Sequence, residues 1–233
     1  MRALLFDIDG TLTQGGGAGG RALGQALHTR KRAAEELGKM RLDGMTDRSI
    51  ARALLAAEGD QSIPLLERME AVEDAEIDST LARYLEALKI GCEEWPYRPL
   101  PGIERLLSAL QKRTDVILGL CTGNLERGAE LKLRSAGLWG PFKFGGYGSD
   151  AEQRADIVRA AWQRAQKLGA KDGLVIGDTS RDILAAHDAG LPACAVATGR
   201  FTVHELAEHG ADIVLESFAD ASAAERLLVG PLR

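Results

Sequence analysis

The stretch Phe6-Asp7-Ile8-Asp9-Gly10-Thr11-Leu12 decides the fold, because it joins the end of a buried strand to a group of acidic and turn-forming residues. The strand is the short apolar run Ala3-Leu4-Leu5-Phe6, after which Gly10 lets the chain turn away. Residues two apart on a strand point to the same side, so Asp7 and Asp9 are expected to converge. Because adjacent carboxylates repel each other, the pair favours a bound cation. The alternative interpretation is a strand-end turn with two solvated aspartates.

Four further apolar runs of similar length follow, and helical patterns separate them. Short apolar runs bounded by polar or turn residues are typical of strands buried on both faces in a parallel sheet. Apolar residues recur at helical spacing from Ile103 to Leu110 and from Ile157 to Leu168. This alternation predicts an α/β fold with a doubly wound parallel sheet. The four runs are Val116–Cys121, Leu174–Gly177, Ala193–Ala197 and Asp212–Leu215.

A long segment without a convincing strand interrupts the alternation and predicts an all-helical insertion. The glycine-rich run Gly15–Gly20 opens it, and Pro96 and Pro99 stand near its end. The glycine-rich run lacks the Lys-Ser/Thr ending of a phosphate-binding loop, so we interpret it as a flexible hinge. The expected division is an inserted helical domain at 15–99 and an α/β core formed by 1–14 and 100–233.

Composition limits the function classes. The chain has 233 residues, of which 45% are hydrophobic and 27% charged, as in an ordinary globular protein. A net charge of −5 argues against non-specific nucleic-acid binding. No apolar run approaches the roughly 18 residues of a membrane span, so we expect no membrane partner. The three cysteines form no CxxC pair, which favours reduced thiols and a cytoplasmic location.

Two other strand ends carry groups that bind anions or cations. The segment Thr122-Gly123-Asn124 follows the run Val116–Cys121. Its hydroxyl and backbone N–H groups can bind an anion at the start of a helix. Asp178 follows a buried run, and Asp182 lies one helical turn later. The carboxyl ends of parallel strands meet at one sheet edge, and such oxygen ligands suit Mg²⁺. Helix capping is the alternative interpretation for both segments.

The order of these motifs resembles the haloacid dehalogenase-like superfamily. The matching segments are Asp7–Leu12, Thr122–Asn124 and Gly177–Asp182. The segment 15–99 resembles the helical cap that this superfamily inserts after its first strand. Within the superfamily, the chain looks most like phosphoglycolate phosphatase-like members. Two further segments support that resemblance, namely Gly44-Met45-Thr46-Asp47 and Thr198-Gly199-Arg200-Phe201.

The resemblance implies a Mg²⁺-dependent phosphatase that acts on a small phosphorylated metabolite. Asp7 would be the nucleophile that forms an aspartyl phosphate, and Asp9 would act as general acid and then as general base. The Asp7 carboxylate, the Asp9 backbone carbonyl and Asp178 would hold Mg²⁺, with support from Asp182. An acid/base residue at Asp9 favours a phosphomonoester hydrolase over the dehalogenases and the phosphonate-cleaving members. The expected phosphate-binding residues are Gly10, Thr11, Thr122, Gly123, Asn124 and Arg154.

One motif departs from the family pattern. The family usually places a lysine ahead of the Gly-Asp motif, but the only cation in the matching segment 148–156 is Arg154. An arginine fork can bridge a phosphate and a carboxylate, so Arg154 suits this role. The alternatives are a surface arginine at this position and a role for Lys132 in its place. Because Lys132 lies several residues into the helix after Thr122, we predict that it does not reach the site.

The sequence leaves several alternatives open. A sugar-phosphate mutase shares the aspartyl phosphate chemistry, and a non-catalytic binding protein could retain the fold. A phospho-receiver domain also clusters aspartates, but a helical insertion after its first strand would be unexpected. The substrate and the oligomeric state cannot be deduced from the sequence. Arg41, Arg48 and Arg52 could bind an acidic group of a substrate, although a solvated helix face is the favoured interpretation.

Overall fold

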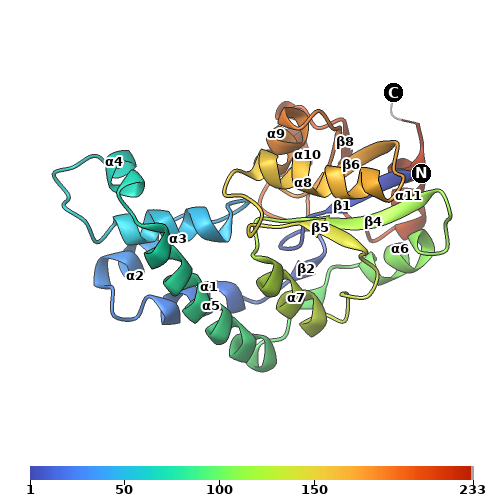
Figure 1. Cartoon of the computed structure of the whole chain (residues 1–233). Helices are drawn as coiled ribbons and strands as arrows, with labels where there is room; N and C mark the ends of the chain where they lie inside the picture. Colours follow the sequence, from blue (N-terminus) through green and yellow to red (C-terminus); the bar gives the residue numbers. More distant parts are fainter. Residues whose placement is uncertain (232–233) are drawn as a thin grey trace.

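A six-stranded parallel sheet forms the centre of the molecule (Figure 1). The computed structural model describes residues 1–231. Strand β1 (Arg2–Phe6) pairs with β4 (Val116–Cys121) on one side and with β6 (Asp172–Gly177) on the other. The strand order β5-β4-β1-β6-β7-β8 confirms the predicted α/β sheet. The outer strands are β5 (Phe144–Gly146), β7 (Ala193–Val196) and β8 (Ile213–Leu215).

Helices cover both faces of the sheet, which explains the apolar runs. In β1, Leu4 and Phe6 pack into one core, whereas Ala3 and Leu5 pack into the other, and all four are fully buried. Complete burial of each leucine contributes about 2 kcal/mol to stability. Figure 1 shows the two helical layers above and below the sheet. The first core also contains α6 (Ile103–Leu110), α7 (Glu126–Ser135) and α11 (Ala221–Val229), and the second contains α8 (Arg154–Lys167), α9 (Ser180–Asp188) and α10 (Val203–Glu208).

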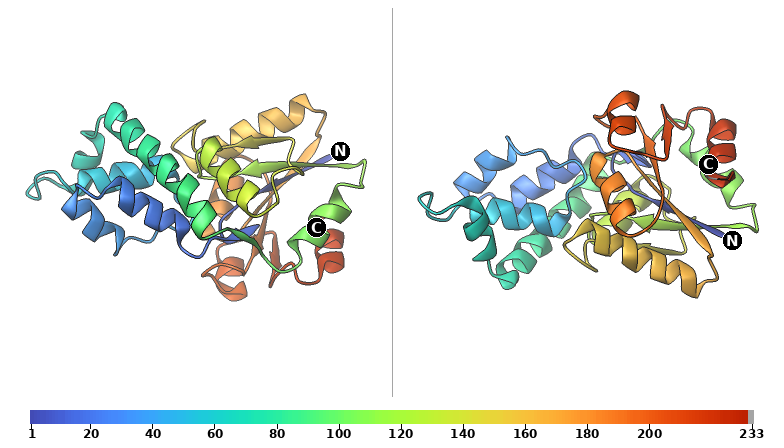
Figure 2. Two further views of the ribbon diagram at one scale, coloured as in Figure 1. Left: turned by 90° about the horizontal axis from the view of Figure 1, so that it is seen from below. Right: turned by 90° about the horizontal axis from the view of Figure 1, so that it is seen from above.

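Five helices gather beyond the carboxyl ends of the strands (Figures 1 and 2). They come from the predicted insertion, and α1 packs against α5. The division into two domains at the predicted boundaries remains a prediction, and residues 232–233 of the core range lie outside the described residues. None of the helices within residues 1–231 is long and apolar enough to cross a membrane. The five are α1 (Ala18–Ala26), α2 (Lys31–Leu37), α3 (Asp47–Ala56), α4 (Leu65–Glu70) and α5 (Asp74–Glu94).

The structure corrects the sequence prediction at three short segments. Half of the glycine-rich run is helical rather than a flexible hinge, because α1 begins at Ala18. Strand β5 was not predicted, since its sequence Phe-Gly-Gly has no apolar run. The insertion also ends in a strand, contrary to prediction. The two residues of β3 (Arg98–Pro99) pair antiparallel with β2 (Thr13–Gln14), so both linkers form one short ribbon.

Candidate active site

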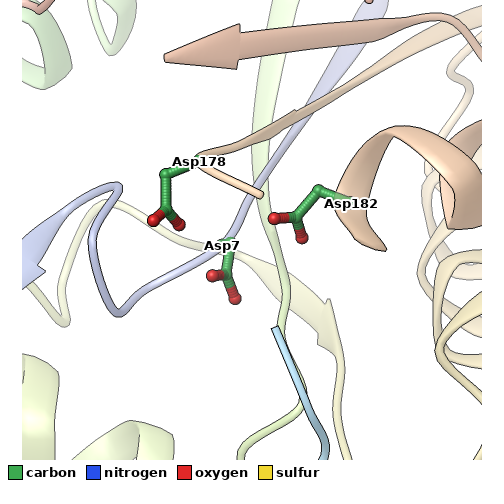
Figure 3. Close-up of side chains that lie close together, drawn as sticks. All are labelled: Asp7, Asp178 and Asp182. Carbon is green, nitrogen blue, oxygen red and sulfur yellow. The ribbon is translucent and has the colours of Figure 1, made fainter. Parts of the chain in front are cut away.

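Three buried carboxylates converge at the carboxyl edge of the sheet. Asp7 directly follows β1, Asp178 directly follows β6, and Asp182 lies in the first turn of α9. One oxygen from each carboxylate lies within 4.8 Å of the other two, and Figure 3 shows the three groups pointing toward one another. Each residue is at most 5% exposed. The structure therefore brings together the acidic residues of the first and last motifs.

The charge of these carboxylates is poorly compensated. Burial raises the pKa of Asp7 to about 7, and the negative charges of Asp182 and Asp9 add to this effect. Burial, together with Asp182 and Asp7, raises the pKa of Asp178 to about 9. The positive charge of Arg154 lowers both pKa values but does not restore them to the usual range. A cluster of this kind suits a bound cation.

Arg154 is the cation that the structure places within this cluster. It begins α8, and its Nη2 atom lies 3.0 Å from Asp7 Oδ1 and 2.5 Å from Asp182 Oδ1. Burial lowers the pKa of Arg154, but the carboxylates of Asp182 and Asp7 outweigh this and raise it overall. The guanidinium thus remains charged. Its position agrees with the expectation that Arg154 reaches the site, and the surface alternative is wrong because the side chain is only 10% exposed.

Asp182 supports the cluster and also caps a helix. Its Oδ1 accepts hydrogen bonds from Arg154, and its Oδ2 accepts them from the backbone N–H (3.0 Å) and the hydroxyl (2.7 Å) of Thr179. The two residues form a capping box at the start of α9. Both carboxylate oxygens are therefore occupied by donors. Asp182 therefore orients Arg154, and the cluster of Asp7, Asp178 and Asp182 could hold a divalent metal.

The turn after β1 holds Asp178 in place. The Thr11 hydroxyl donates a hydrogen bond of 3.3 Å to Asp178 Oδ1. A cavity lies beside this cluster and is lined by Asp7 and Asp178, but Thr11 does not line it. The predicted phosphate-binding role of Thr11 therefore finds no support in its position. Gly10 has a φ of +83°, and a β-carbon there would lie 2.4 Å from Asp178 Oδ2. A glycine is therefore required on both conformational and steric grounds.

Thr122, Gly123 and Asn124 line the cavity that also contains Asp7 and Asp178, a position that their predicted phosphate-binding role requires. Neither Thr122 nor Asn124 caps α7 with its side chain, because the N-cap residue of α7 is Leu125. The capping alternative is therefore wrong for this segment. Asn124 Nδ2 instead donates to Thr122 Oγ1 (2.7 Å) and to Asp9 Oδ2 (2.8 Å). A β-carbon at Gly123 would lie 2.4 Å from the carbonyl oxygen of Met45, so only glycine permits this close approach of the helical insertion.

Lys132 reaches the site, and the prediction that it does not is wrong. Its Nζ atom lies 2.7 Å from Asp9 Oδ2 and 2.5 Å from Asn124 Oδ1, and its side chain is 6% exposed. Burial lowers the pKa of Lys132, but Asp9 and the neighbouring Tyr97 raise it well above its usual value overall. Among residues 1–231, two buried cations therefore line the site, with Arg154 on the nucleophile and Lys132 on the expected acid/base residue, whereas the third lining cation, Arg200, is exposed and pairs with Asp43.

The helical insertion closes the cavity with residues that sequence analysis missed. The cavity has a volume of about 420 Å³, and Asp47, Tyr84 and Tyr97 line it together with the motif residues. The Asp47 backbone N–H donates to the Gly123 carbonyl oxygen (2.8 Å), and its carboxylate accepts the N–H of Leu125 (2.8 Å). Burial raises the pKa of Asp47 to about 6. In the sequence, only the Gly44–Asp47 segment indicated that the helical insertion contributes residues to the cavity.

The arginines around that segment do not line the cavity. Arg48 pairs with Asp74 and Asp78, and Arg52 pairs with Asp74 and Glu152. Arg41 is exposed and is also absent from the cavity wall. None of the three arginines therefore binds in the cavity, but the predicted solvated helix face is not what holds them: Arg41 lies between α2 and α3, and Arg52 is only 20% exposed and also donates to the Val72 carbonyl oxygen.

Comparison with known proteins places the site in a family context. A phosphoglycolate phosphatase from Rhodospirillum rubrum is 28% identical over 227 residues, covering 94% of this chain and 88% of that protein. A phosphoglycolate phosphatase from Agrobacterium fabrum is 29% identical over 161 residues, covering 67% of each chain. The crystal structure of a hydrolase from Pseudomonas syringae has the same fold, with a TM-score of 0.73, 22% identity and coverage of 99% of this chain and 100% of the other.

The family model for haloacid dehalogenase-like hydrolases matches residues 1–190, which contain the three motifs Asp7–Leu12, Thr122–Asn124 and Gly177–Asp182. The acidic cluster lies at the strand ends where the sequence resemblance placed it, and the sheet is parallel as expected. This chain therefore belongs to the haloacid dehalogenase-like hydrolases.

Proposed function

We propose that the protein is a Mg²⁺-dependent phosphatase that hydrolyses a small phosphorylated metabolite, of which 2-phosphoglycolate is the first candidate. The observation that carries this proposal is the pairing of a buried nucleophile candidate, Asp7, with Arg154 at the carboxyl edge of the sheet. Two relatives named phosphoglycolate phosphatase support the substrate class. The cavity volume of about 420 Å³ suits a small substrate rather than a macromolecule.

In the proposed reaction, the Asp7 carboxylate attacks phosphorus and the bond to the leaving alkoxide breaks. The guanidinium of Arg154 and the backbone at Gly123 would neutralise and hold the phosphoryl oxygens. Asp9 would donate a proton to the departing alkoxide, and its carboxylate would then take a proton from the water that hydrolyses the aspartyl phosphate. The network supports this role, because Lys132 and Asn124 hold Asp9 Oδ2, while Oδ1 makes no hydrogen bond within residues 1–231.

A divalent cation between Asp7 and Asp178 would supply charge neutralisation during phosphoryl transfer. The fit rests on the converging oxygens and on the raised pKa values of both carboxyls, which mark negative charge without sufficient compensation. The proposed ligands are the side chains of Asp7 and Asp178 and the backbone carbonyl of Asp9.

Metal removal is expected to stop the reaction. Chelation should reduce phosphate release to the background rate, and added Mg²⁺ should restore it. Asp178→Asn should raise the Mg²⁺ concentration for half-maximal activity by about tenfold or more, because one anionic ligand is lost. Asp172→Asn is the matched control, since Asp172 lies at the opposite end of β6, where it pairs with Arg2. Full activity of the wild-type protein in metal-free buffer would contradict the proposed metal site.

Replacing Asp9 with asparagine should reveal a dependence on the leaving group. General acid catalysis contributes about 10²- to 10⁴-fold, and an alkyl alkoxide needs a proton far more than p-nitrophenolate does. We therefore expect the first step to slow at least tenfold more for an alkyl phosphate than for p-nitrophenyl phosphate. Single-turnover kinetics with both substrates measures this difference. Equal losses on the two substrates would exclude Asp9 as the general acid.

A screen of phosphorylated metabolites with phosphate detection tests the proposed function directly. The expected result is release of inorganic phosphate from one or a few small phosphomonoesters, with 2-phosphoglycolate among them. Formation of an isomeric phosphate ester without phosphate release would instead identify a mutase. Absence of both products across the screen, with Mg²⁺ present, would favour a non-catalytic binding protein.

A further inference from the structure

We infer that Lys132, Tyr84, Tyr97 and the first turn of α1 form a subsite for a carboxylate on the non-transferred end of the substrate. This inference rests on the proposed phosphatase function and names the residues that would select the substrate. None of these four elements has a role in the reaction described above, apart from the contact of Lys132 with Asp9. All of them line the cavity.

The polar groups of the subsite surround one spot on α1. A β-carbon placed on Gly19 would lie 3.2 Å from the Tyr97 hydroxyl, 3.8 Å from Lys132 Nζ and 3.9 Å from the Tyr84 hydroxyl. Three side chains from α5, α7 and the segment before β3 therefore approach the same backbone position. Because Gly19 has no side chain, the space between these groups remains part of the cavity.

Two components of this cluster, Tyr84 and Lys132, present hydrogen-bond donors to the cavity. Tyr84 is 4% exposed overall and lines the cavity, and its hydroxyl makes no hydrogen bond to a side chain or backbone group in residues 1–231. An ammonium group has three donors, and Lys132 uses two of them on Asp9 and Asn124. Because the Tyr84 hydroxyl opens onto the cavity and has no protein partner, it is available to donate a hydrogen bond to a ligand.

The start of α1 adds two further donors. Its N-cap, Gly17, provides no side-chain cap. The backbone N–H groups of Ala18 and Arg21 donate to Gly15 and Gly17, whereas those of Gly19 and Gly20 have no partner within the described chain. The N-terminus of a helix carries a partial positive charge and favours an anion. The backbone N–H groups of Gly19 and Gly20 thus add donors without protein partners to this end of the cavity.

Two carboxylates also lie near Lys132, and each accepts at least one hydrogen bond through its Oδ2 atom. Asp9 accepts hydrogen bonds from Lys132 and Asn124, and Asp47 accepts the N–H of Leu125. Lys132 lies close enough to Asp47 for its positive charge to offset part of the negative charge of that carboxylate. Since Asp9 would face the leaving oxygen, a group one or two bonds beyond that oxygen would meet Lys132 and the tyrosines. This spacing matches a phosphorylated two-carbon hydroxy acid.

The test compares two ligands of equal length, 2-phosphoglycolate and 2-hydroxyethyl phosphate, which differ in having a carboxylate or a neutral hydroxyl. Calorimetry on Asp7→Asn protein measures binding without turnover. We expect this parent to prefer the carboxylate ligand by about tenfold to hundredfold, the range of hydrogen bonds to a charged group. Equal affinity for both ligands in the parent protein would overturn the proposal.

Gly19→Ala in the same background places a methyl group in the subsite, while alanine favours the helix. It should remove most of the preference for the carboxylate and leave the melting temperature unchanged or higher. Gly24→Ala is the matched control, because it makes the same substitution in α1 where the new methyl meets only Leu37, at 3.7 Å. Tyr84→Phe should also reduce the preference.

A retained preference in Gly19→Ala protein would place the carboxylate elsewhere and overturn the inference. The binding experiment does not depend on catalysis. Failure of the phosphatase proposal would instead appear as absence of phosphate release by the wild-type protein, so the two failures are distinguishable.

Discussion

Replacing Asp7 with asparagine is expected to lower kcat by about 10⁴-fold or more, because the amide cannot attack phosphorus in place of the carboxylate. The fold should survive. Asparagine has nearly the same shape, and it removes a negative charge from a site where three buried carboxylates already repel each other. We therefore expect the melting temperature of metal-free protein to stay the same or to rise.

The covalent step can be measured directly. In a single turnover with substrate labelled on the phosphoryl group, acid quenching should trap label on the wild-type protein and none on Asp7→Asn. Asp156→Asn is the matched control, because it makes the same change at an exposed position in the first turn of α8. Substantial turnover by purified Asp7→Asn protein would rule out Asp7 as the nucleophile.

Arg154→Met has the second largest expected effect, because one side chain neutralises two of the three buried carboxylates. Loss of a charged hydrogen bond to the transferring phosphoryl group is worth about 2–4 kcal/mol, or tens- to hundreds-fold in kcat. The fold should also lose stability, since removing one partner of a buried ion pair typically costs about 3–5 kcal/mol. Arg154→Lys keeps the positive charge but loses the planar, two-pronged donor group of arginine. Compared with Arg154→Met, it should restore more of the folding stability than of kcat.

Lys132→Met is the comparison for Arg154→Met, because both variants remove a buried cation of the site. Arg154 contacts the nucleophile, whereas Lys132 contacts Asp9 and Asn124. We therefore expect the larger loss of kcat on p-nitrophenyl phosphate from Arg154→Met, measured at a temperature where both proteins are folded. A larger loss from Lys132→Met would mean that Lys132, rather than Arg154, serves as the phosphate-binding cation.

The central strands were predictable from sequence because burial on both faces leaves a clear pattern. The predicted run Val116–Cys121 matches β4 residue for residue, and β1 was predicted to within one residue. Strand β5 was not predictable in this way. Its two glycines lie under other side chains, since a β-carbon at Gly145 would meet Tyr147 and one at Gly146 would meet α8. Tertiary contacts, rather than local apolar character, place that strand.

The site was predictable where residues follow strand ends and not where they come from helices. The distance of Lys132 from the site was overestimated, because α7 begins at Glu126 and not directly after Thr122. Six residues of helix span only about 9 Å, and a lysine side chain covers much of the remaining distance. Tyr84 and Tyr97 gave no signal, since an aromatic residue at helical spacing or beside prolines is as typical of a core as of a cavity wall. Their role depends on how the insertion closes over the sheet.

The short ribbon formed by β2 and β3 has a consequence for how this enzyme could diversify. Thr13 pairs with Pro99 and Gln14 pairs with Arg98, so the chain leaves and re-enters the sheet region at adjacent points. The separation between these two points does not depend on what lies between them. Insertions, deletions or wholesale replacement of the intervening helices can therefore accumulate without shifting β1 or α6. The ribbon thus fixes the spacing of the two connections at the sheet, whatever the length of the chain between them.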